Sequence, residues 1–157
     1  MALVVVTVIG FSGALFSSSS SSPGNQFAAG SVSLKLTQTG QIIDGAALKP
    51  GDNRTGTQTV TNLGHKAKLT LGTLELDTAS ALVGVLIVVV RQTDPVLSDP
   101  VYSGPLGDLR AAALGTFAHN ESRTYSVEIR WPEEQNSATL EGAGTSFRFD
   151  WRAESVP

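Results

Sequence analysis

The fold is decided by alternating stretches, of which the clearest is Tyr125-Ser126-Val127-Glu128-Ile129-Arg130-Trp131. A period of two places the apolar side chains on one face of a β-strand and the polar side chains on the other. Three further stretches repeat this alternation, at residues 32–36, 68–71 and 147–152. The sequence therefore predicts several half-buried strands, each with one face on a core and one face in water.

Turn-forming residues separate these strands. They occur at four places: Lys49-Pro50-Gly51-Asp52, Asn62-Leu63-Gly64, Ser103-Gly104-Pro105 and Gly142-Ala143-Gly144. Glycine, proline and asparagine in such clusters favour tight turns over continued strands. Short strands spaced by turns predict an all-β fold, an antiparallel β-sandwich.

Two segments depart from the alternation. Residues 82–90 form an almost continuous aliphatic run, too short to span a membrane, which predicts a central strand covered on both faces. Residues 106–114 contain Asp108 followed by three alanines, which predicts one or two turns of helix with Asp108 near the start.

The N-terminal region precedes this β pattern. Residues 1–14 are mostly apolar and end with small residues, Ser12 and Ala14, at the −3 and −1 positions of a signal-peptidase site. We expect cleavage after Ala14, an N-terminal arm at residues 15–27 and a β-sandwich domain at residues 28–157. No lysine or arginine precedes the apolar core, so a buried N-terminal strand remains the alternative.

Composition narrows the function classes. The 157 residues include no cysteine, so an exported domain of this kind depends on packing and hydrogen bonding. The net charge of −3 and the scattered basic residues give no electrostatic footprint for nucleic acid. After removal of the signal segment we expect no stable membrane span.

Two segments of the chain carry a family pattern. The first begins Phe16-Ser17 and continues as Gly-Asn-Gln-Phe-Ala-Ala-Gly-Ser-Val-Ser-Leu at residues 24–34. The second joins Leu48-Lys49-Pro50-Gly51-Asp52 to Val60-Thr61-Asn62-Leu63-Gly64. Both segments resemble the TasA and camelysin family. Residues 120–132 and 147–149 match that family more loosely, and residues 79–116 lie outside the resemblance.

The resemblance implies a jelly-roll β-sandwich that is secreted and assembles into an extracellular, cell-surface filament, either a biofilm matrix fibre or a pilus. Its partners would be neighbouring identical subunits, with an anchoring or capping protein as a further candidate. The resemblance also implies that the arm is a donated strand that completes the sheet of the next subunit. The residues implied in this donor strand are Leu15, Phe16, Ser17, Ser18, Ser19, Ser20, Ser21, Ser22 and Phe27.

The length of the arm permits such donation. Residues 15–27 span roughly 40 Å when extended, whereas a globule of this size has a diameter of about 35 Å. Main-chain hydrogen bonds would supply most of the grip, because the serines bury little side-chain surface. A flexible serine-rich linker is the alternative interpretation of the same run.

An enzyme is the competing function class, since camelysin relatives are classed as metallopeptidases. The chain has two histidines, His65 and His119, each beside a turn signal, and no His-Glu-x-x-His motif. Two exposed loop histidines are therefore the favoured interpretation, and we predict neither a catalytic residue nor a metal or other cofactor.

Further candidate sites lie in the loops. Asp94, Asp99 and Asp108 are possible calcium ligands by residue type, but their spacing matches no EF-hand and favours a solvated acidic loop. Asn53 and Asn120 begin formal glycosylation sequons. The predicted function is a structural filament subunit. A monomeric secreted binding module is the first alternative, and a metallopeptidase is the second.

Overall fold

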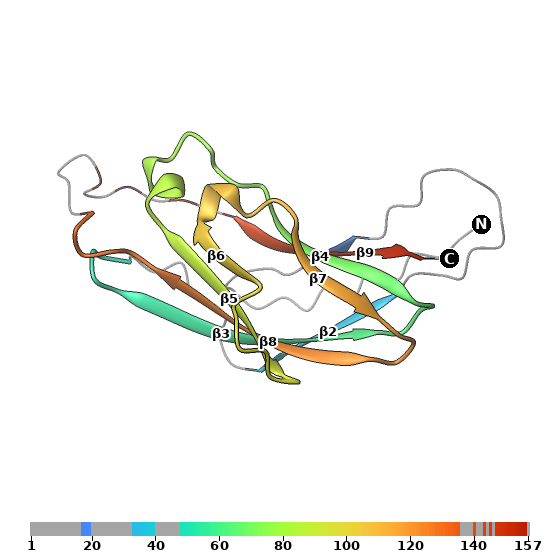
Figure 1. The fold of residues 1–157 in the computed structure, drawn as a ribbon. Helices are drawn as coiled ribbons and strands as arrows, with labels where there is room; N and C mark the ends of the chain where they lie inside the picture. Colours follow the sequence, from blue (N-terminus) through green and yellow to red (C-terminus); the bar gives the residue numbers. More distant parts are fainter. Residues whose placement is uncertain are drawn as a thin grey trace.

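Two β-sheets face each other in the computed structural model of the chain (Figure 1). The structure describes residues 17–19, 33–39, 48–135, 140, 143, 145 and 147–156. The predicted signal segment therefore lies outside the described residues, as do Leu15, Phe16, Phe27 and Ser20 to Ser22 of the arm.

The strands divide into a four-stranded and a five-stranded sheet. The four-stranded sheet has the order β1 (Ser17–Ser19), β9 (Arg148–Ser155), β4 (Ala67–Leu74) and β7 (Ala112–Phe117). The five-stranded sheet has the order β2 (Leu34–Thr39), β3 (Asn53–Asn62), β8 (Ser122–Arg130), β5 (Ile87–Asp94) and β6 (Tyr102–Pro105). Neighbouring strands are antiparallel except β1 and β9, which are parallel.

The core lies between the sheets and follows the predicted alternation. In β8, Tyr125, Val127 and Ile129 are fully buried while the residues between them are partly exposed. Tyr125 meets Trp151 of the opposite sheet with ring centroids 5.5 Å apart. The predicted all-β sandwich is confirmed.

Some of the predicted turns are confirmed and one is wrong. The turn at residues 49–52 is confirmed, since the Asp52 amide donates to the Lys49 carbonyl at 2.9 Å and Gly51 has a φ of +89°. A left-handed φ in this position suits glycine, because it has no Cβ. The predicted turn at residues 103–105 is wrong, because these residues form most of β6, an edge strand where a terminal proline is tolerated. Gly142 and Gly144 lie outside the described residues.

The structure has two 3-10 turns, η1 (Ala81–Gly84) and η2 (Leu106–Asp108). The helical turn predicted within residues 106–114 is confirmed by η2, whereas η1 lies where a strand was predicted. The alanines at 111–113 are not helical, contrary to expectation. Ala112 begins β7, because pairing of Ala112 and Ala113 with β4 outweighs the helix propensity of alanine, which is the highest of any residue but is worth only tenths of a kcal/mol per residue.

The aliphatic run at residues 82–90 begins as η1 and becomes β5 only at Ile87. Val88, Val89 and Val90 are all buried, and β5 lies between β8 and β6. The predicted strand covered on both faces is therefore confirmed for the second half of the run.

The two ends of the sandwich differ, and we name them by their connections. The end that we call the hairpin end carries two turns, each of which joins strands of different sheets. They are the β3–β4 turn at residues 63–66 and the β7–β8 turn at residues 118–121. β9 ends there, since Ser155 pairs with Ala67, and it starts at the opposite, far end, where Arg148 pairs with Leu74. The hairpin end lies to the right in Figure 1.

Candidate assembly interface

In the four-stranded sheet, the position beside β9 is occupied by β1, which belongs to the N-terminal arm. From β3 to β9 the strands are distributed between the two sheets as the last seven strands of an eight-stranded jelly roll are, with β5 and β6 together in the five-stranded sheet. In that fold the first strand lies beside the last, in the sheet opposite the second strand. Here β2 pairs instead with β3 in the five-stranded sheet. The place beside β9 therefore falls to β1.

β1 fills this place over a short length. On its inner side β9 pairs with β4 over all eight of its residues. On its outer side, β1 is three residues long, with Ser17 opposite Asp150 and Ser19 opposite Arg152. Residues 153–155 extend past the end of β1 toward the hairpin end. The structure thus places the first three serines of the run along the edge of its own sheet, in parallel orientation.

The side chains of β9 divide between the two faces of the sheet. Phe149 and Trp151 are fully buried on the core side. Asp150 points to the other face, yet it is also 0% exposed, and it contacts the guanidinium of Arg152. A carboxylate buried in this way needs hydrogen-bond donors and a cation nearby. The edge therefore presents a covered acidic group beside the position of the serine run.

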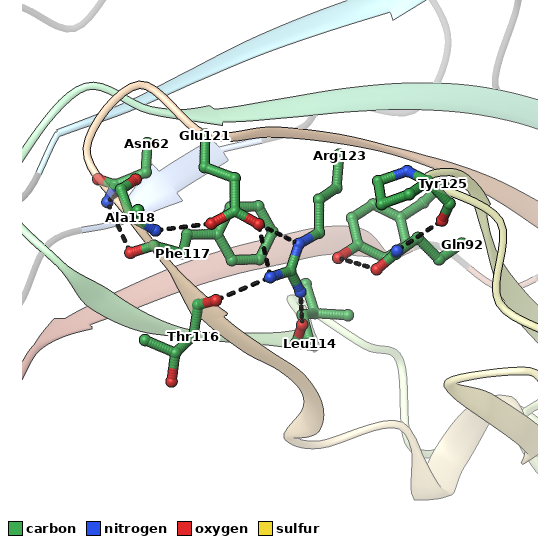
Figure 2. Close-up of polar contacts among 10 residues, drawn as sticks. Asn62, Gln92, Leu114, Thr116, Phe117, Ala118, Glu121, Arg123 and Tyr125 are labelled. Carbon is green, nitrogen blue, oxygen red and sulfur yellow. Dashed lines mark hydrogen bonds and ion pairs between the residues drawn. The ribbon is translucent and has the colours of Figure 1, made fainter.

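The edge formed by β7 is blocked against strand addition. A bulge at Gly115, whose φ is +88°, interrupts the pairing of β7 with β4. Arg123 then donates to the carbonyls of Leu114 and Thr116, both at 2.8 Å (Figure 2). Bulges and occupied main-chain groups are common devices that protect sheet edges.

The edge formed by β6 is protected in a different way. This strand has four residues and ends in Pro105, which has no amide hydrogen. β9 differs from both edges, because it is eight residues long and holds neither a bulge nor a proline. The outer side of β9 is therefore a better acceptor for an added strand than β6 or β7.

Arg123 lies at the centre of a network at the hairpin end. Its Nε atom donates to Glu121 Oε1 at 2.7 Å, and its guanidinium carbon lies 4.1 Å from the centroid of the Phe117 ring. Glu121 Oε2 also accepts from the Ala118 amide at 2.7 Å. Partial burial raises the pKa of Glu121, but the Ala118 hydrogen bond and the Arg123 guanidinium outweigh it, so the pKa lies below its ordinary value.

Asn62 joins the two turns of the hairpin end. Its buried side-chain amide donates to the carbonyls of His65 and Ala118, at 2.7 and 3.1 Å, and its Oδ1 accepts from the Gly64 amide at 3.1 Å. The family pattern at residues 60–64 includes Asn62, but the sequence predicts no role for it. The only available signal is that asparagine favours turns.

Tyr125 supports the β5–β6 loop from inside the core. Its hydroxyl donates to Gln92 Oε1 at 3.3 Å, and Gln92 Nε2 donates to the Pro95 carbonyl at 2.6 Å. Burial raises the pKa of Tyr125 to about 12, against the opposing effect of the Arg123 guanidinium. The phenol therefore stays neutral throughout the physiological range.

The two histidines lie in turns that the structure brings together. His119 Nδ1 lies 2.8 Å from the carbonyl oxygen of Gly64, the neighbour of His65, and both histidines are exposed. Within the described part of the chain, no three His, Cys, Asp or Glu residues cluster as metal ligands would. This contact joins the β3–β4 and β7–β8 turns.

The acidic candidates are separated. Asp94 ends β5 near the hairpin end, whereas Asp108 lies in η2, which follows the far-end pairing of Pro105 with Ile87. Asp94, Asp99 and Asp108 are all exposed. The structure therefore does not bring the predicted calcium candidates into one site.

Both sequon asparagines are accessible. Asn53 is exposed at the start of β3, and Asn120 is exposed in the β7–β8 turn with a φ of +61°. Either side chain has the exposure that glycosylation requires.

Neither a family model nor a curated protein matches this chain. The resemblance to the TasA and camelysin family therefore stays a prediction. In the portion of the chain that the structure describes, there is no helix with the length and apolar character needed to cross a bilayer.

Proposed function

We propose that this protein is a structural subunit of an extracellular filament, in which the N-terminal arm of one copy pairs with the outer edge of β9 in the next copy. The observation that carries this proposal is the edge itself. β9 offers eight residues beside the place of a jelly-roll first strand, and among the described residues of its own chain three pair with it there.

A longer strand from a neighbour has more to gain at this edge. Each added main-chain hydrogen bond contributes about 0.5–1.5 kcal/mol net. Leu15, Phe16 and Phe27 each add roughly 1.5–3 kcal/mol if the neighbour buries them fully. Serine hydroxyls also suit the buried carboxylate of Asp150, because they are small hydrogen-bond donors.

The geometry of donation decides the form of the assembly. An arm that leaves one copy and enters a different surface of the next makes a heterologous contact, and such a contact builds open filaments unless the rotation closes a ring. Donation also covers an edge that would otherwise pair with unrelated strands. A secreted matrix fibre or a cell-attached pilus is the form of assembly that this arrangement supports.

Truncation tests the proposal. A chain that begins at Ala28 retains every strand from β2 to β9 but lacks the arm, so it should remain monomeric. A chain that begins at Leu15 should form fibres under the same conditions, as judged by electron microscopy. As a matched control, Ser20 to Ser22 are replaced by threonine, which keeps the length and favours β geometry, and fibres should persist. Fibres of normal length from the truncated chain would refute the proposal.

Export is a separate part of the proposal. Mass-spectrometric sequencing of the secreted protein should give a mature N-terminus at Leu15 or Phe16. Recovery of the protein inside cells with residues 1–14 intact would argue against export. The proposal also assigns no catalysis, and a peptidase activity lost on chelation or on substitution of His65 or His119 would replace it.

A monomeric binding module is the second candidate, and one loop favours it. Val96 is 78% exposed and Leu97 is 49% exposed in the β5–β6 loop, which Gln92 anchors from the core. Rigid loops with exposed apolar tips are common binding elements. Size-exclusion chromatography over a concentration series distinguishes the candidates, because the binding module stays monomeric throughout.

A further inference from the structure

Two side chains at the beginning of β8 bond to the main chain along the open side of β7. β7 has β4 on one side, and no described strand lies on the other. Arg123 donates to the carbonyls of Leu114 and Thr116, both at 2.8 Å, and Glu121 Oε2 accepts from the Ala118 amide at 2.7 Å (Figure 2). The Glu121–Arg123 pair thus supplies donors to two carbonyls and an acceptor to one amide.

These main-chain groups recur at the interval of a β-ladder. Residues 114, 116 and 118 are two apart, and an antiparallel strand directs main-chain groups to the same neighbour at every second residue. A strand added to β7 would likewise donate its amides to carbonyls and accept from amides. The Glu121–Arg123 pair therefore makes the kinds of hydrogen bond that a neighbouring strand would make.

Gly115 leaves room for the guanidinium between two of these positions. A Cβ atom at residue 115 would lie 3.2 Å from Arg123 Nη1, which is tighter than an ordinary contact. The φ of Gly115, +88°, also suits glycine. The same glycine thus permits both the bulge in β7 and the close approach of the arginine.

The Glu121–Arg123 pair is fixed by further contacts. Arg123 Nη2 lies 2.6 Å from Glu121 Oε1, and only 18% of the Arg123 side chain is exposed. The guanidinium also lies over the Phe117 ring, which adds a cation–π contact. A strand that displaced Arg123 would have to break charge-assisted hydrogen bonds, which are stronger than the neutral main-chain bonds that it would form. Strand addition at β7 therefore gains little while the pair is in place.

We propose that the Glu121–Arg123 pair takes the place of a neighbouring strand at β7, and that a chain without it pairs through β7 with a second copy of itself. An unprotected edge strand is a template for pairing with another chain. The partner follows from symmetry, because two identical edges can pair antiparallel about a two-fold axis. The pair therefore keeps copies of this protein from joining at β7, in a filament subunit and in a monomeric module alike.

A single engineered cysteine can report this pairing, because the chain has no cysteine of its own. Ala113 is exposed on β7, so A113C marks the strand. The full chain with A113C is compared with the full chain that also carries Arg123→Met, whose side chain can cover Phe117 but cannot donate. Both are treated with a short bismaleimide. We expect R123M to raise the yield of cross-linked dimer about 10-fold, equivalent to about 1.4 kcal/mol in the free energy of association.

Two matched controls isolate the edge. Arg130 is an exposed arginine of the same strand as Arg123, so R130M should leave the yield of A113C dimer unchanged. With T55C in place of A113C, R123M should not raise the yield, because Thr55 is exposed on β3 in the other sheet. Equal rises at T55C and A113C would indicate general aggregation and would overturn the inference.

Arg123→Lys keeps the test valid if the methionine variant does not fold. Lysine keeps the charge but lacks the planar fork that reaches two carbonyls, so R123K should give a yield between those of arginine and methionine. Cooperative unfolding in urea identifies the variants that fold. If every folded variant gives the same yield as Arg123, the inference is overturned. The proposed function is judged separately, by the fibres of the unmodified chain.

Discussion

The side chain of Asn62 donates a 3.1 Å hydrogen bond to the main-chain carbonyl of Ala118, and this contact ties the β3–β4 turn to the β7–β8 turn (Figure 2). Each of these turns carries the chain from one sheet to the other. Asn62 is 0% exposed and also donates to the His65 carbonyl at 2.7 Å. One buried amide thus holds together two of the connections that define the sandwich.

Substitution of Asn62 should be costly. Asn62→Ala leaves several carbonyls without their donor, and buried polar groups left unsatisfied cost about 1–3 kcal/mol each. We expect a loss of roughly 2–4 kcal/mol in the free energy of unfolding, measured by urea denaturation. Asn62→Asp keeps the shape but cannot donate, so it should lose a similar amount. Thr57→Ala, on the outer face of the same strand, should change stability by less than about 0.5 kcal/mol. A loss below 1 kcal/mol for both Asn62 variants would contradict this role.

Glu121 makes the stability of the hairpin end depend on acid pH. Its pKa is lower in the folded state than its ordinary value of 4.5, so the folded state favours the carboxylate. This contribution is complete above pH 4.5 and is lost as the pH falls through the lower folded pKa. For a partly exposed ion pair the contribution is about 0.5–1 kcal/mol. Glu121→Gln should remove this dependence, so its stability deficit should shrink between pH 7 and pH 3. A deficit that stays constant over that range would exclude the linkage.

Tyr125 acts in the opposite pH range. Burial raises its pKa from 10.0 to about 12, so the folded state favours the neutral phenol. Its contribution is complete below pH 10 and is lost as the pH rises from 10 toward 12. In the wild-type protein, phenolate absorbance should show delayed titration that becomes normal on unfolding. Tyr125→Phe should retain only the titration of Tyr102, the other tyrosine of the chain, whose pKa is also raised by burial. Titration of both tyrosines near pH 10 in the folded protein would show that the phenol is not buried.

The arm-less chain should terminate growing filaments. A chain that begins at Ala28 keeps β9 as an acceptor and has no strand to donate. When it is mixed with full chains, it should accept one arm and stop extension, so that mean fibre length falls as its mole fraction rises. An arm-less chain with Arg148 and Arg152 changed to proline serves as the control, since proline removes main-chain donors from β9. Equal shortening by both truncated chains would indicate a mechanism that does not use this edge.

Much of the fold can be predicted from short-range patterns in the sequence, whereas the candidate assembly interface cannot. The alternation at residues 125–131 predicts β8 because each side chain must choose between the core and water. The alanines at 111–113 mislead because helix propensity is worth tenths of a kilocalorie per residue, less than the ladder that Ala112 and Ala113 form with β4. The role of Asn62 depends on a carbonyl fifty-six residues away, at Ala118.

The acceptor edge also could not be predicted from the sequence. Whether β9 has an open side depends on the order of strands in the sheet, and that order is set by the complete topology. The alternation of residues 147–152 predicts the strand but gives no information about its neighbours. The sequence identifies a candidate donor, and the structure is needed to identify the acceptor.

Hydrogen exchange at the amides of β9 tests the central claim most directly. About half of these amides face β4 in any strand of this kind, and the others face the outer edge. If the arm of a neighbour pairs along the whole edge, the outward amides should exchange about 100-fold more slowly in fibres than in the chain that begins at Ala28, an effect of roughly 2.8 kcal/mol. The β4-facing amides should change little. Equal exchange of the outward β9 amides in fibres and in the arm-less chain would contradict the account.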